Sequence, residues 1–176
     1  RIRALCLSIL GEIEMKRLLV LMGVSLPFLG IAAEAVLSMG GMLKLQSPEV
    51  ELRGSLFTVG WKNSVSGGGT SAPDEKGVCA FELKASDQEK VSGKAEVTQD
   101  ADGAVRAVYT FTPRTDVTLN GLYVGAHFSA QKLIGARWKA DAKEGVFPEK
   151  RGALSVFSGK VKQVEIIRPA PQPERL

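Results

Sequence analysis

Apolar and polar residues alternate in short segments along most of the chain after Val36. An alternation of period two places the apolar side chains of a strand on one face. Turn-forming residues separate the segments, and none of them keeps a helical period for the ~10–12 residues of an ordinary helix. The pattern therefore predicts an all-β fold, an antiparallel β-sandwich of about nine strands. The expected strands lie within residues 42–46, 50–61, 77–85, 92–99, 104–113, 119–130, 132–140, 146–148, 152–159 and 160–169.

The same alternation predicts which faces are buried. In the strand over 104–113, which follows a hairpin turn at residues 100–103, the expected core residues are Val105, Ala107, Tyr109 and Phe111. In the segment 50–61, Val50 and Leu52 share one face, and a break at Gly54 is expected to put Leu56 on another. Residues 63–77 contain three successive glycines and no periodicity, so they are expected to form a flexible surface loop.

A basic and apolar segment precedes this pattern. Lys16 and Arg17 are followed by a mostly apolar run over 18–31, interrupted by Pro27, and then by Ala-Glu-Ala at 33–35. That is the layout of a secretory signal peptide. The apolar run is shorter than the about 20 apolar residues that a membrane span needs. We expect a signal-peptide helix within residues 15–35, with cleavage after Ala35. Secreted or periplasmic localisation follows, with no stable membrane anchor after cleavage.

This layout predicts the organisation of the whole chain. Residues 1–14 are expected to be a translated leader upstream of the start at Met15, and residues 36–168 a single sandwich domain. Residues 169–176 contain three prolines and are expected to be a linker or tail, with the chain continuing past Leu176. The one cysteine after residue 35, Cys79, can form no internal disulfide and is expected to be a small buried apolar residue.

Charge and candidate chemistry exclude several classes of function. The net charge is +4, but the basic residues are scattered, so no nucleic-acid footprint is predicted. His127 is the single histidine, so we expect no metal site, and the glycine run at 67–69 lacks the Lys-Ser/Thr of a phosphate loop. Asp100 and Asp102 resemble the start of a calcium loop, although a plain hairpin turn explains them. No catalytic residue and no cofactor is predicted.

Aromatic side chains are the remaining candidates for binding. A sugar ring has an apolar face of C–H groups, on which a flat aromatic side chain stacks while polar neighbours bond the hydroxyls. The candidate ligand-binding residues are Trp61, Tyr123, His127 and Trp138. Tyr123 and His127 share the strand face opposite Leu122. The alternative for both tryptophans and for Tyr123 is burial in the sandwich core, because tryptophan is highly buried on average.

One region resembles a known class of domain. The run "TDVTLNGLYVGAHFSAQKLIGARWKADAKEGVFPEK" and the closing "ALSVFSGKVKQVEIIRP", between Thr115 and Pro169, are similar to the N-terminal non-catalytic β-sandwich region of large secreted bacterial glycoside hydrolases. The resemblance implies a polysaccharide partner and a catalytic domain further along the same chain. The similar stretch contains no catalytic residue of such enzymes, so no catalytic role passes to this sequence.

Three hypotheses about function follow from the sequence. The first is a non-catalytic accessory or carbohydrate-binding sandwich of a secreted carbohydrate-active enzyme, of which this chain is a fragment. The second is a complete small exported protein, structural or adhesive, without a sugar ligand. The third is a free-standing lyase or hydrolase built on the sandwich, which the missing catalytic motif disfavours.

Overall fold

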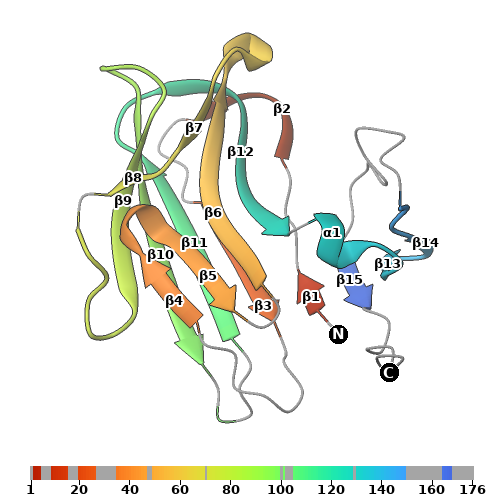
Figure 1. Cartoon of the computed structure of the whole chain (residues 1–176). Coiled ribbons are helices and arrows are strands. Elements are labelled where there is room, and N and C mark those ends of the chain that lie inside the picture. Colours follow the sequence, from red (N-terminus) through yellow and green to blue (C-terminus); the bar gives the residue numbers. More distant parts are fainter. Residues whose placement is uncertain are drawn as a thin grey trace, which may run out of the picture.

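The described chain is all-β, as the alternation predicts. A computed structural model describes residues 2–4, 9–15, 20–26, 35–46, 49–69, 71–99, 101, 105–128, 130–149 and 164–167, with backbone alone up to residue 26 (Figure 1). All strand pairs in it are antiparallel. Two of its three sheets face each other across a common core, so the predicted β-sandwich is confirmed.

The first layer of the sandwich has the order β2–β12–β6–β5–β4. The edge of β6 that faces away from β12 pairs with two strands. Strand β5 pairs with residues 49–52 and β7 with residues 55–57. The bounds of these strands are Ile9–Met15 (β2), Ala35–Ser38 (β4), Met42–Gln46 (β5), Glu49–Thr58 (β6), Ser64–Ser66 (β7) and Val117–Phe128 (β12). Two short 3-10 turns, η1 (Met39–Gly41) and η2 (Val59–Trp61), connect β4 to β5 and β6 to β7.

The second layer has the order β3–β11–β10–β9–β8. Its long members form a meander, in which residues 91–99 of β10 pair with residues 105–113 of β11, and β9 pairs on the other side. The register confirms the predicted hairpin, although of its loop only Ala101 lies within the described residues. The bounds are Val20–Leu26 (β3), Gly68–Gly69 (β8), Val78–Lys84 (β9), Lys90–Gln99 (β10) and Val105–Pro113 (β11).

Tyr109 joins the two layers through the middle of the core. Its side chain is fully buried, and its one hydroxyl proton is shared by two carbonyl oxygens of the opposite layer, that of Gly41 at 2.9 Å and, at the longer distance of 3.3 Å, that of Leu52. The ring stacks on Phe111 with centroids 6.4 Å apart. Burial raises the pKa of Tyr109 far above its ordinary value of 10.0. A neutral phenol is therefore fixed between the sheets.

Phe81 fills a space that glycines leave for it. A Cβ atom added at Gly41 or at Gly93 would overlap its ring, and one added at Gly67 would come within 2.8 Å of it. The ring also meets Phe111 edge-on, with centroids 6.0 Å apart. Because a native core has no room for extra atoms without displacement, these glycines are the reason that the two layers can approach around one large ring.

Burial confirms part of the predicted core and corrects the rest. The four core residues predicted in β11, and Cys79 in β9, are at most 1% exposed. The break expected at Gly54 is wrong, because Val50, Leu52, Gly54 and Leu56 are all buried on one face, where the Phe111 ring takes the place of a side chain at 54. The loop expected over 63–77 contains β7 and β8, whose backbones add to the edges of β6 and β9.

Backbone segments of the expected leader and signal peptide pair with the sandwich. Strand β2 lies along residues 117–122 of β12, and β3 lies along residues 105–111 of β11. The helix expected for the signal peptide is therefore wrong for Val20–Leu26, which is an edge strand; residues 16–19 and 27–34 lie outside the described residues. An apolar run without a polar helical face can form a strand wherever a sheet edge offers unpaired backbone groups.

A third, small sheet lies beside the sandwich, to its right in Figure 1. Its order is β1–β15–β13–β14, with bounds Ile2–Ala4 (β1), Arg137–Ala140 (β13), Lys143–Val146 (β14) and Val164–Ile167 (β15). The strand expected over 132–140 is confirmed only from Arg137, because a single helical turn, α1 (Ala130–Leu133), precedes it. The strand expected over 152–159 and the proline-rich end at 169–176 lie outside the described residues.

The contacts of Tyr109 lead to a first prediction. Tyr109→Phe removes the buried hydroxyl that bonds the opposite layer, and it should lower the free energy of unfolding by about 1–3 kcal/mol in urea titrations followed by circular dichroism. Thr112→Val on the exposed face of the same strand should change it by less than about 0.5 kcal/mol.

The raised pKa adds a pH dependence to this prediction. A group whose folded-state pKa is raised stabilises the fold below its unfolded pKa, 10.0 for tyrosine, and this contribution is lost as pH rises beyond that value. Stability should therefore fall above pH 10.0 in the parent chain and fall less steeply in Tyr109→Phe. Equal slopes in the two proteins would contradict the role assigned to the buried phenol.

Candidate functional site

A groove of about 440 Å³ lies between the outer face of the first layer and the small third sheet. Strands β6, β7 and β12 form its floor and one side, and Val164 and Ile166 of β15 form the opposite wall. Arg53, Phe57, Tyr123 and His127 are among the side chains that line it. Concave sites with mostly apolar walls and a few polar groups are the usual binding sites of small ligands.

An aromatic cluster forms one end of this groove. Phe57 on β6 lies 5.2 Å from Trp61 and 5.5 Å from Tyr123, measured between ring centroids, and Trp61 lies 6.4 Å from Tyr123. The register places Phe57 directly opposite Gly121 on β12, two residues before Tyr123. The cluster thus arises from the outward-facing positions of two paired strands and from the turn that follows one of them.

Trp61 has an unusual backbone conformation for its size. It ends η2 with φ at 58°, next to Gly60 at 75°, and its side chain is 49% exposed. The left-handed region costs a residue with a Cβ about 1–2 kcal/mol. The Gly60 N–H donates to Asn120 Oδ1 at 2.8 Å, which ties the turn to β12. The turn therefore keeps a large indole at the surface in a strained conformation, and strain of this kind concentrates at functional sites.

Tyr123 lies flat along its own strand. A Cβ added at Gly121 would overlap its hydroxyl group, so the ring occupies the space that this glycine leaves. The hydroxyl oxygen is shielded from solvent and has no hydrogen-bond partner among the described residues. Burial raises the pKa of Tyr123 above its ordinary value. The phenol is therefore neutral, and its hydroxyl is buried against Gly121 while the ring lines the groove.

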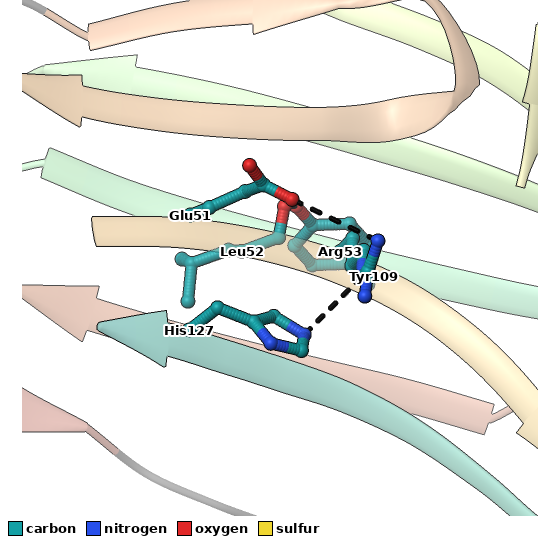
Figure 2. Close-up of polar contacts among 5 residues, drawn as sticks. All are labelled: Glu51, Leu52, Arg53, Tyr109 and His127. Atoms are coloured by element: carbon teal, nitrogen blue, oxygen red, sulfur yellow. Dashed lines mark hydrogen bonds and ion pairs between the residues drawn. The ribbon is translucent and has the colours of Figure 1, made fainter. Parts of the chain in front are cut away.

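The other end of the groove carries charge. The Nε atom of Arg53 donates to His127 Nε2 at 3.2 Å, and Nη1 of Arg53 lies 3.9 Å from a carboxylate oxygen of Glu51 (Figure 2). Gly125 is directly opposite Arg53 on β12, and its missing side chain leaves the space that the imidazole of His127 approaches. Nε2 of His127 is therefore the acceptor of the hydrogen bond from Arg53.

The structure brings three of the four predicted ligand-binding residues together. Tyr123 and His127 line the same groove, and Trp61 contacts its aromatic end. The alternative in which Trp61 is buried in the core is wrong, because half of its surface is exposed. Trp138 belongs to a separate, smaller hollow on β13, where its indole covers Gly145 of the neighbouring strand.

Two important members of the site, Arg53 and Phe57, were missed by sequence reasoning. The signal was present, because Glu51, Arg53, Ser55 and Phe57 alternate with the buried residues of β6. The break expected at Gly54 hid this continuous outer face. Ser64 and Ser66 of β7 also line the groove, but they lie in a segment without periodicity, and only their pairing with β6 reveals their position.

Among the described residues, no group of three or more His, Cys, Asp or Glu side chains could hold a metal ion. Glu82 and Glu96 form ion pairs with Lys84 and Lys94 of their own strands, at 3.6 and 3.1 Å. Within the described ranges, no helix is long and apolar enough to cross a membrane.

Comparisons with known proteins do not assign this chain to a family. No protein-family model, no curated protein and no solved structure matches it.

The backbone of Trp61 leads to a second prediction. In Trp61→Gly, relief of the left-handed strain offsets the loss of ring contacts worth about 0.5–1.5 kcal/mol, so the free energy of unfolding should change by less than about 1 kcal/mol. Trp61→Ala loses the same contacts and keeps the strain, so it should be less stable than Trp61→Gly by about 1 kcal/mol. Urea unfolding of both variants, followed by circular dichroism, measures the difference; an alanine variant as stable as the glycine variant would show that the turn is not strained.

Proposed function

We propose that this chain is a non-catalytic, carbohydrate-binding β-sandwich that acts as an accessory domain of a secreted carbohydrate-active enzyme. The observation that carries the proposal is the half-exposed indole of Trp61, held in a left-handed turn beside Tyr123 and Phe57 at the end of a groove. Burying this indole would stabilise a purely structural protein more than exposing it does.

The groove has the chemistry that a saccharide requires. Flat aromatic side chains at one end offer surfaces on which the C–H face of a sugar ring stacks. Ser55, Ser64 and Ser66 along one side supply hydroxyl groups that both donate and accept hydrogen bonds. A few polar groups in an otherwise apolar hollow give orientation and specificity. The resemblance of residues 115–169 to accessory regions of bacterial glycoside hydrolases supports the same ligand class.

Export is part of this proposal. The basic pair at 16–17, the apolar run and the Ala-Glu-Ala motif at 33–35 support a signal peptide cleaved after Ala35. Every described residue that lines the groove follows this position, so cleavage leaves the lining residues in the mature chain.

Cleavage has a structural consequence that can be measured. It removes β1, β2 and β3 and opens the edges of β15, β12 and β11, and exposed edges promote pairing with another chain. The exported protein should begin at Val36 in N-terminal sequencing and associate with rising concentration in sedimentation velocity. The uncleaved variant Ala33→Arg keeps all three strands and should remain monomeric. An exported protein that retains residues before Val36 would contradict the signal-peptide assignment.

A second candidate is an exported adhesive protein without a sugar ligand. It is favoured by the exposure of Val59, at 48%, next to Trp61 in the same turn, because neighbouring apolar side chains at a surface also suit a protein partner. This candidate predicts that no polysaccharide binds to the protein.

Binding to polysaccharides tests the two candidates. In affinity electrophoresis through gels that contain plant or bacterial polysaccharides, the full chain should be retarded by at least one of them. Trp61→Gly should abolish the retardation because the stacking surface is lost, whereas Trp138→Phe, in the separate hollow, should leave it unchanged. Retardation that survives Trp61→Gly, or its absence with every polysaccharide, would contradict the proposed function.

A further inference from the structure

We propose that the ligand of this groove is an acidic oligosaccharide, whose uronate carboxylate is bound by Arg53 while a neighbouring sugar ring stacks on the aromatic cluster of Phe57, Trp61 and Tyr123. The inference rests on the proposed function and names the chemical class of the saccharide. Residues on β6, β12 and β15 carry it.

Arg53 is the residue that distinguishes an acidic ligand from a neutral one. Its guanidinium has five N–H donors, and in the described part of the chain one of them makes a hydrogen bond, to Nε2 of His127. Glu51 is 3.9 Å away, which is beyond hydrogen-bonding distance. A cation with this many unused donors matches the two oxygens of a carboxylate, the group to which arginine binds in bidentate geometry.

The electrostatics of the lining agree with an anionic ligand. Among the described residues that line the groove, Arg53 carries a full charge and none is a carboxylate. Glu51 is directly opposite His127 in the register and is close to the groove without lining it. The apolar wall of Val164 and Ile166 lowers the local dielectric constant, which strengthens a contact between the guanidinium and a carboxylate.

The length of the groove requires more than one sugar unit. Arg53 and Phe57 are four residues apart on one face of β6, which corresponds to about 13 Å along a strand. A carboxylate bound at Arg53 and a ring stacked at Phe57 and Trp61 therefore belong to different units of one oligosaccharide. Ser55 of β6 and its pairing partner Ser66 of β7 lie between the two ends, in reach of the connecting hydroxyl groups, and Ser64 lies opposite Phe57 at the aromatic end.

The test compares acidic oligosaccharides with their own methyl esters. Oligomers of galacturonate, of mannuronate and of glucuronate, each in free-acid and esterified form, are titrated into the full chain by calorimetry. At least one free acid should bind about tenfold or more tightly than its ester, because a hydrogen bond to a charged group contributes about 1.5–3 kcal/mol. Its affinity should also fall with increasing salt.

Two variants give opposite results if Arg53 is the anchor. Arg53→Gln should lose the tenfold preference for the acid and keep the affinity for the ester. Glu51→Gln removes a negative charge next to the guanidinium and should raise the affinity for the acid about two- to fivefold, as expected for an exposed pair. Both side chains are partly exposed, at 41% and 32%, and circular dichroism confirms that each variant is folded.

The outcomes separate this inference from the proposed function. Binding of acid and ester with equal affinity, abolished by Trp61→Gly, would overturn the role of Arg53 and leave carbohydrate binding intact. Binding of the free acid that is unchanged in Arg53→Gln would also overturn it. If neither these oligosaccharides nor any polysaccharide in the gels binds, both the inference and the proposed function fail.

Discussion

The contact between the two layers of the sandwich is the constraint on which the rest of the structure depends. Tyr109 is fully buried and donates to carbonyl oxygens of the opposite layer, and Phe81 occupies the space left by glycines. Neither ring can be moved without a cost of several kcal/mol. Displacing Tyr109 would leave a buried phenol without acceptors, and adding Cβ atoms at the glycines would overlap the ring of Phe81. With the inner faces set in this way, each strand has one register and one outward side.

The candidate site is a consequence of that register. Because Leu52 and Leu56 point into the core, Arg53 and Phe57 must point out, and the pairing of β6 with β12 brings them beside Tyr123 and His127. The glycines of β12 have a different role from those of the core. They are on the outer face, where Gly121 leaves room for the ring of Tyr123 and Gly125 for the imidazole of His127.

The pairing of β2 and β3 connects the fold to the proposed export. In the whole chain these strands complete the edges of both layers, whereas the sequence of the same segment has the layout of a signal peptide. Open edges are positions at which sheets join other chains. Strand β12 therefore takes part in both features. Its outer face lines the proposed binding groove, and its backbone forms one of the edges that cleavage would open.

Alternation by itself determined the all-β class and the buried face of β11. It also showed that Tyr123 and His127 are on the same face of their strand, because side-chain direction in a strand has period two. It did not determine the continuous outer face of β6, since a glycine in the sequence does not show that the rings of Phe111 and Phe81 take the place of its side chain. Nor did it place Ser64 and Ser66, or separate Trp61 from Trp138. Those positions depend on contacts between residues far apart in the chain and on one left-handed turn, which only the tertiary structure decides.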